Sequence, residues 1–189
     1  MPFEYEPPAT AELRQGEIVG PIVELRAAHP AIEIAEGVVP AVDSIKHRMM
    51  VIITADCDLL RDFIERERPQ RERGLPNLLN HILLIDMYSE TEIAGAWPSG
   101  FGHRERRHAL RNQNERFHCF PKAKIRGSAS EVEALHMDFK NVLGTPPQAL
   151  YQGLASGQII RHALIPPLFL QDLTHRLYGF LSRVGPDYE

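Results

Sequence analysis

An unbroken run of five apolar residues at positions 49–53 constrains the fold of this chain more than any other feature. Strand residues alternate between two faces, so such a run predicts a strand buried on both faces or a central strand of a barrel. The polar turn Asp56-Cys57-Asp58 follows, and apolar residues then recur at helical spacing. We expect the buried strand to lead into a helix after Asp58, with Asp56 or Asp58 as its cap. The apolar positions of this helix are Leu59, Leu60, Phe63 and Ile64.

Other segments carry weaker signals for strands and short helices. Residues 16–25 are rich in strand-forming side chains and are broken by Gly20-Pro21, which predicts two short strands around a bend. A turn or short helix is expected at 89–93, and a short helix at 149–154. An edge strand or a hairpin is expected at 31–42. Further strands are expected at 81–88, 135–143 and 158–164.

The clearest helix signal lies near the end of the chain. Pro166 and Pro167 stand where a helix can begin, because the first helical positions need no amide donor. Gly185-Pro186 is a typical helix end. The apolar stripe between them consists of Leu170, Leu173, Leu177, Phe180, Leu181 and Val184.

Together these elements predict an α+β fold: a small antiparallel SH3-like barrel or curved sheet, a helix after Asp58, a basic arm and a packed C-terminal helix. We expect a single domain over residues 1–189, and its 43% hydrophobic content is enough for an apolar core. Within it we expect a loose leader at 1–12, a barrel-like core at 13–98, the basic arm at 99–130, and strands plus the C-terminal helix at 131–189.

Composition favours a cytoplasmic protein. The two cysteines, Cys57 and Cys119, are too few for a disulfide framework and are expected to be free thiols in a reducing compartment. The acidic start is unlike a secretory signal, and no apolar stretch approaches the length that spans a bilayer, so we expect no membrane association. No phosphate loop or dinucleotide motif is present, and no histidine or cysteine spacing matches a zinc site. We therefore expect no cofactor and no metal.

Charge is distributed unevenly along the chain. The net charge is −4, yet residues 101–126 contain eight basic and two acidic side chains, with phenylalanines interleaved. This mixture is typical of surfaces that bind single-stranded nucleic acid, where cations contact phosphates and rings stack on bases. Arg106 and Arg107 are adjacent, however, and point in different directions on a helix, so a solvated loop or one that docks on an acidic protein remains an alternative. The candidate phosphate contacts are Arg104, Arg106, Arg107, Arg111, Arg116, Lys122 and Lys124.

The two ends of the buried strand carry candidate catalytic residues. At its end, Cys57 can serve as a nucleophile, and Asp56 or Asp58 as a general base or metal ligand. The alternative is that Cys57 packs as a small apolar residue at a helix start while the aspartates cap the helix. At its start, Arg48 beside His47 can hold a phosphate through two hydrogen bonds. A surface ion pair is the alternative for Arg48.

Two resemblances add to these residue patterns. Runs near 15–18, 51–59, 116–121, 137–140 and 180–185 resemble an uncharacterised family of bacterial proteins, over most of the chain. More weakly, the first half resembles the MazF/PemK toxins, which are SH3-like barrels that cleave RNA. The resemblance rests on Gly16-Glu17-Ile18-Val19 and on Lys46-His47-Arg48 before an apolar strand, although Met49 stands where those toxins usually have proline. It implies an endoribonuclease in which Arg48 contacts RNA.

The leading functional hypothesis is therefore a bacterial nucleic-acid-binding protein, RNA-directed, of the toxin or phage and mobile-element defence type. Arg48 and the basic arm would hold the phosphates of RNA or DNA. The alternative is a non-enzymatic adaptor or subunit of a multi-protein bacterial system, whose protein partner is encoded nearby. Because the rest of the chain is acidic, head-to-tail homo-oligomers are a further expectation.

Overall fold

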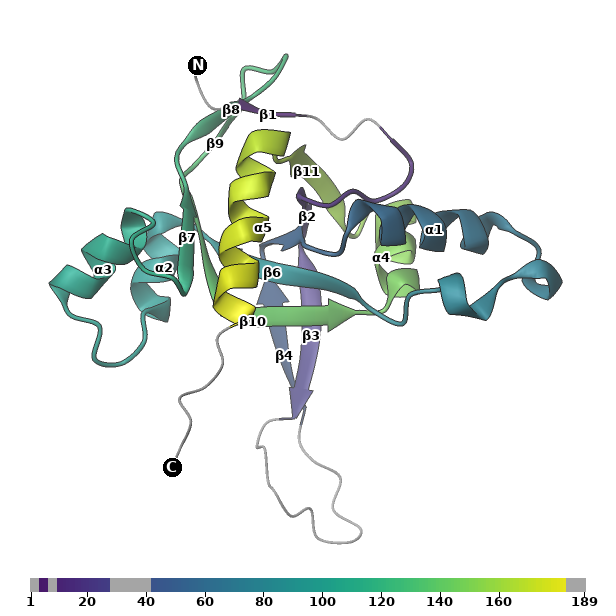
Figure 1. Ribbon diagram of the computed structural model, residues 1–189, viewed down its shortest axis with the longest axis horizontal. Helices are drawn as coiled ribbons and strands as arrows, with labels where there is room; N and C mark the ends of the chain where they lie inside the picture. The colour runs from purple at the N-terminus through teal and green to yellow at the C-terminus, as the bar shows by residue number, and fades with distance from the viewer. Residues whose placement is uncertain (1–3, 7–9, 28–41, 183–189) are drawn as a thin grey trace, which may run out of the picture.

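A six-stranded antiparallel sheet forms the centre of the molecule (Figure 1). The structure is a computed structural model that describes residues 4–6, 10–27 and 42–182. The predicted apolar strand is central in this sheet, as its composition requires. In spatial order the strands are β11 (Ile160–Leu164), β2 (Glu17–Gly20), β5 (Met49–Ile52), β6 (Ile82–Tyr88), β10 (Leu135–Thr145) and β7 (Phe117–Phe120).

Two smaller sheets flank the central one. The hairpin of β3 (Ile22–Ala27) and β4 (Val42–His47) projects from it, because β3 follows β2 directly after Gly20-Pro21 and β4 precedes β5 (Figure 1). The third sheet contains β1 (Glu4–Tyr5), β8 (Ala123–Ile125) and β9 (Glu131–Val132). The sheets are mostly antiparallel and do not close into a barrel. The α+β class is therefore confirmed, whereas the SH3-like barrel is not.

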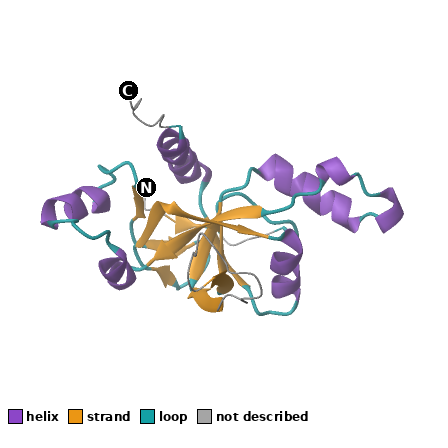
Figure 2. Ribbon diagram, turned by 90° about the horizontal axis from the view of Figure 1, so that it is seen from below, coloured by secondary structure: helices purple, strands orange, loops and turns teal. Residues whose placement is uncertain are grey.

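Helices lie on both faces of the central sheet. Figures 1 and 2 show α5 across one face of the sheet. The α1 and α4 helices lie towards one end of the molecule, and the α2 and α3 helices lie towards the other. The helices are α1 (Asp56–Glu67), α2 (Glu90–Ala96), α3 (His103–Leu110), α4 (Pro147–Ala155) and α5 (Pro167–Leu181), with short 3-10 helices η1 (Gln70–Glu72) and η2 (Leu75–Asn77).

The side chains of β5 alternate between two separate cores, which confirms burial on both faces. Met49 and Val51 pack in a core that includes Leu173 and Leu177 of α5. Met50 and Ile52 pack in a second core with Leu59 of α1 and Leu150 of α4. A third, smaller cluster joins Ile93, Ala109 and Phe117 beneath α2 and α3.

The C-terminal helix matches its prediction closely. Pro166 is the N-cap of α5 and Pro167 is its first residue. Leu173 and Leu177 are buried, and Leu170 and Phe180 pack against the same core. Leu181 is exposed. The expected end at Gly185-Pro186 and the stripe residue Val184 lie outside the described residues, as does most of the expected strand at 31–42.

Three expectations about the chain's outline need correction. The helix begins at Asp56, before the expected start. The leader is not loose throughout, because Tyr5 is fully buried and β1 pairs with β8. The basic segment is not an arm. It contains α3, then β7 within the central sheet, then β8, because its phenylalanines need a core to pack in.

Candidate functional site

Arg48 lies at the bend between β4 and β5, and its side chain is 59% exposed. Its Nη1 donates to Oε1 of Glu133 at 3.1 Å and lies 3.9 Å from Oε1 of Glu92 in α2. Arg48 also lines a cavity of about 310 Å³ together with His162 of β11. Nε2 of His162 has no hydrogen-bond partner in the described part of the chain. The surface ion pair is thus present, and Arg48 remains accessible to a ligand.

Asp56 anchors the start of α1 to the segment before β2. Its two oxygens accept from Nε and Nη2 of Arg14 at 3.1 and 3.0 Å, and the backbone N–H of Gln15 donates to Oδ1 at 2.6 Å. Partial burial opposes ionisation, but these hydrogen bonds hold the pKa of Asp56 below its ordinary value. Because both of its oxygens already accept hydrogen bonds, Asp56 acts as a structural ion-pair partner rather than a free general base.

Cys57 is exposed, so the interpretation of this thiol as a packed residue is wrong. Its Sγ lies 3.7 Å from Oδ1 of Asp58, a long and weak contact. The N-cap of α1 is Ala55, without a side-chain cap, so neither aspartate caps the helix as expected. Asp56 and Asp58 instead lie in its first turn, where the helix dipole stabilises negative charge.

Arg48 and the Asp56-Cys57-Asp58 turn do not form one site. They lie at opposite ends of β5, and an extended chain advances about 3.3 Å per residue. Their partners also differ, with Glu133 at one end and Arg14 at the other. A catalytic mechanism that joins Arg48 to this turn is therefore not supported by the geometry.

The basic residues of 101–126 divide between structural and exposed roles. Arg116 binds both oxygens of Asp138, through Nε at 2.7 Å and Nη2 at 2.5 Å, and this hydrogen bonding raises its pKa. Asp138 is only 3% exposed, so Arg116 serves to neutralise a buried carboxylate. Lys124 pairs at 4.0 Å with Glu131, and Lys122 is exposed. Arg126 pairs with Glu6 at 2.9 Å. The other four are exposed on α3 and the turn after it: Arg104, Arg106, Arg107 and Arg111.

A groove between α2 and α3 collects the exposed cations beside an aromatic ring. Its volume is about 370 Å³, and Trp97, His103, Arg106 and Arg107 line it. The indole stacks on the Phe101 ring, with centroids 6.1 Å apart and planes 18° from parallel. Although Arg106 and Arg107 are adjacent in sequence, both therefore reach the same concave surface.

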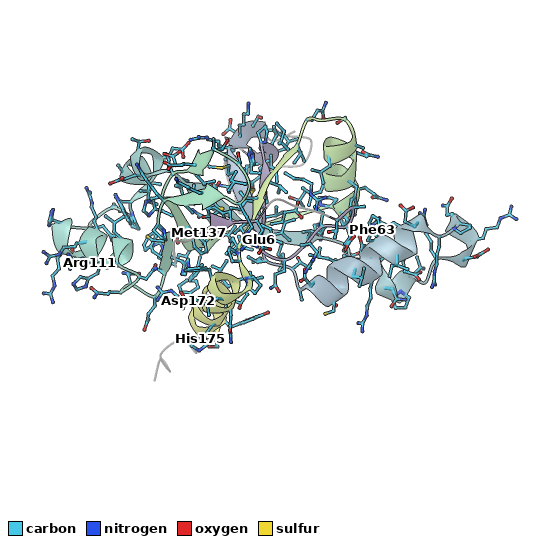
Figure 3. All side chains as sticks on the ribbon, turned by 90° about the horizontal axis from the view of Figure 1, so that it is seen from above. Glu6, Phe63, Arg111, Met137, Asp172 and His175 are labelled. Carbon is cyan, nitrogen blue, oxygen red and sulfur yellow. The ribbon has the colours of Figure 1, made fainter. Side chains whose placement is uncertain are left out.

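A second cavity, of about 380 Å³, adjoins this groove. The two share Glu90 and Leu110 in their walls, and the second is also lined by Arg111, Cys119 and His136. Figure 3 shows that Arg111 and Phe63 of α1 lie towards opposite ends of the molecule, with Arg111 at the α3 end.

His47, the neighbour of Arg48, has a structural role. It is 7% exposed and lies between two carboxylates, with Nε2 at 3.0 Å from Glu24 and Nδ1 at 2.9 Å from Asp86. These contacts connect β3, β4 and β6. Because a carboxylate engages each ring nitrogen, neither nitrogen of His47 is available to contact a ligand.

Sequence reasoning missed two features of this end of the molecule. Trp97 is the only tryptophan of the chain, and its position just before the basic segment was a usable signal. Cys119 and His136 gave no such signal, because only the pairing of β7 with β10 brings them together. No group of three or more His, Cys, Asp or Glu side chains that could hold a metal ion occurs among residues 4–6, 10–27 and 42–182.

Comparisons with protein-family models, curated proteins and solved structures gave no match to this chain. Within the same described ranges, the helices are too short or too polar for any of them to cross a membrane. Function must therefore be inferred from the geometry and charge of the surfaces described above.

Proposed function

We propose that this protein binds single-stranded nucleic acid, RNA in particular, in the groove between α2 and α3. The observation that carries the proposal is that Arg106 and Arg107 line the same groove as the indole of Trp97. Guanidinium groups contact backbone phosphates, and an indole offers a face on which a base can stack. The resemblance of the first half to MazF/PemK toxins favours RNA over DNA, and a bacterial toxin or mobile-element defence role.

The charges on α3 are available for phosphates. Arg104, Arg107 and Arg111 make no ion pair within the part of the chain that the structure describes. Arg106 is held by a hydrogen bond from Nε to the carbonyl oxygen of Phe101 at 3.1 Å, which leaves its terminal nitrogens for a ligand. This arrangement presets one guanidinium in the groove, so less conformational entropy is lost when a phosphate binds.

The proposal is limited to binding. Arg48 shares its cavity with Glu131 and Glu133, and two carboxylates beside a scissile phosphate would repel it. Asp56 is occupied by Arg14, and Cys57 lies with it at the far end of β5. The residues chosen from the sequence as catalytic thus lack the arrangement that RNA cleavage needs, and Arg48 is at most an additional phosphate contact.

The test is a titration of fluorescently labelled single-stranded RNA and DNA between about 50 and 200 mM salt. Four arginines on phosphates correspond to a slope of about −2.8 in log affinity against log salt concentration. The double variant Arg106→Glu/Arg107→Glu should make the slope shallower, at about −1.4, and should weaken binding strongly. A matched control reverses the same number of charges elsewhere, in Arg61→Glu/Arg71→Glu, where both side chains are exposed near α1.

Absence of binding at the lowest salt concentration would refute the proposal. Equal losses in the α3 variant and the control would show that net charge, not the groove, governs binding. Trp97→Leu separates stacking from charge. It should weaken RNA binding while leaving the salt slope unchanged, since base stacking contributes about 1–3 kcal/mol without releasing counterions.

A protein partner at the β3–β4 hairpin is the second candidate. Val23, Leu25 and Val42 lie on one face of this two-stranded sheet and are 59%, 71% and 59% exposed. A projecting hairpin with an apolar face is typical of a surface that another chain covers. Sedimentation across a range of concentrations tests a second copy as the partner, and Leu25→Glu should abolish any association seen. A monomer at every concentration would exclude self-association.

A further inference from the structure

Cys119, the buried cysteine, contacts a histidine. Its Sγ lies 2.9 Å from Nδ1 of His136 and 3.3 Å from the carbonyl oxygen of Ala109 at the end of α3. Cys119 and His136 are directly opposite each other in the antiparallel pairing of β7 and β10. Side chains at opposed positions of a sheet are held at contact distance by the backbone itself, so this pair is built into the fold.

The backbone of Cys119 is fixed on a second side. Oδ1 of Asn112 accepts from its N–H at 2.6 Å, and Nδ2 of Asn112 donates to its carbonyl oxygen at 2.9 Å. Asn112 itself adopts a left-handed conformation, with φ of 56°. One amide side chain thus holds both backbone groups of Cys119, which leaves the thiol little positional freedom.

A second, independent observation points to a ligand at this pair. His136 is only 5% exposed, yet its Nε2 has no hydrogen-bond partner among the described residues. An unpaired buried ring nitrogen is costly, so such atoms usually have a functional explanation. Cys119 and His136 both line the cavity of about 380 Å³ beside α3, together with Glu90 and Arg111.

The pair is neutral at rest. Burial raises the pKa of Cys119 to about 12, although the charge of Arg176 opposes this. Burial also lowers the pKa of His136, and the charges of Glu90 and Glu133 oppose that shift. Both shifts disfavour the thiolate, so the sulfur can attack only if the neutral imidazole takes its proton in the same step, which is general-base catalysis of a nucleophile.

We propose that Cys119 and His136 form a nucleophilic thiol centre that accepts an acyl group from an ester or thioester whose leaving group carries a separate negatively charged substituent. The acyl group would enter the cavity beside α3. Arg111 lines that cavity, and Arg106 and Arg107 line the groove that adjoins it, so the negative charge of the leaving group has cations to contact. This inference uses Cys119 and His136 alone for chemistry and does not require RNA binding.

The reaction balances without any other reagent than water. Sγ of Cys119 attacks the carbonyl carbon, and its proton passes to Nδ1 of His136. The bond from the carbonyl carbon to the leaving group breaks, and the leaving group takes that proton from His136. A thioester on Cys119 remains. Water, deprotonated by His136, then hydrolyses the thioester, releasing a carboxylic acid and restoring the thiol.

The experiment uses the full chain with Cys57→Ala, which removes the exposed competing thiol, and p-nitrophenyl acetate as acyl donor. We expect a burst of p-nitrophenolate close to one equivalent per chain, and peptide mapping should place the acetyl group on Cys119. His136→Gln should slow the burst by about 100-fold or more, since general-base catalysis contributes at least that much. Circular dichroism and thermal unfolding show whether each variant is folded.

Three outcomes would overturn the proposal: no burst, acetylation elsewhere than Cys119, or an unchanged rate in folded His136→Gln. Mapping of the acetylated chain tests the site even if Cys119→Ala fails to fold. The charge of the leaving group is tested with two acyl donors, S-acetyl phosphopantetheine and S-acetyl pantetheine, which differ only in the phosphate of the leaving group. Arg111→Ala should slow acylation only by the phosphorylated donor, and equal slowing with both would refute the anionic leaving group.

Discussion

Arg161 of β11 neutralises a fully buried carboxylate, and its removal is the sharpest test of what holds the first half of the chain in place. Its Nε donates to Oε1 of Glu17 in β2, and its Nη2 donates to Oε2 of Glu17 at 2.8 Å. Glu17 is 0% exposed. The same guanidinium also donates to the carbonyl oxygens of Thr10 and Glu12. One side chain thus joins β11, β2 and the segment before β2.

We predict that Arg161→Met destabilises the protein by about 3–5 kcal/mol, because Glu17 would be left buried without a cation. In a chain of this size each kcal/mol corresponds to about 2–4 °C, so the melting temperature should fall by about 6–20 °C. Urea and thermal unfolding measure both quantities. The double variant Glu17→Met/Arg161→Met should recover much of the loss, since it removes the unpaired charge together with its partner.

The reasoning fails if Arg161→Met unfolds within about 1 kcal/mol of the unmodified protein, which is the range expected for a surface ion pair. It also fails if the double variant is less stable than Arg161→Met. That result would show that the contacts to Thr10 and Glu12, rather than the charge of Glu17, dominate the contribution of Arg161.

Three further predictions concern other buried groups. Arg116→Ala should cost about 3 kcal/mol in urea unfolding, because Asp138 would lose its only ion-pair partner among the described residues. Gly20→Ala should destabilise by at least about 3 kcal/mol, or prevent soluble expression, since its Cβ would collide with the backbone oxygen of Arg48. Burial lowers the pKa of His118 from 6.5 to about 4. As the pH falls, the imidazole is therefore protonated in the unfolded chain before it is protonated in the folded one. The free energy of unfolding should drop by about 3 kcal/mol between pH 6.5 and pH 4. His118→Leu should reduce this slope in unfolding measured from pH 7 to 4.5, and an unchanged slope would contradict the assignment.

Local sequence signals predicted the elements that depend on neighbouring residues. The apolar run at 49–53, the bend at Gly20-Pro21 and the prolines before α5 each act within a few positions, and each appears in the structure. The pairing of strands depends on contacts between distant segments. No local pattern indicated that β7 would oppose β10, or that Cys119 would meet His136.

The predicted burial of side chains in α1 is partly wrong, and the spacing of its residues in the sequence could have corrected part of that prediction. Cys57 precedes the buried Leu59 by two residues, which is about 200° around a helix, so burial of one implies exposure of the other. Leu60 and Ile64 are 45% and 46% exposed, against the expected apolar stripe. Asp62 is buried in their place.

The polar face of α1 is buried because the following segment folds back over it. Oδ1 of Asp62 accepts from the backbone N–H of Leu79 at 2.8 Å, and Oε2 of Glu65 accepts from that of Gly74 at 2.5 Å. Arg66 neutralises Asp62 at 2.7 Å. Backbone amides of an irregular loop need acceptors, and two carboxylates supply them. Hydrophobic periodicity cannot reveal this requirement.

The central strand has a consequence for how the chain avoids misfolding. The β5 strand is apolar on both faces. If its register shifted by one residue, Met49 and Val51 would exchange cores with Met50 and Ile52. The hydrophobic effect would barely oppose this shift, because the same apolar side chains would stay buried. The polar groups at its ends oppose it instead. Arg48 would enter the first core, and Oγ1 of Thr54 would lose the N–H of Leu83, now at 2.8 Å. Apolar residues bury this strand, but its correct alignment is selected by the few polar atoms at its ends.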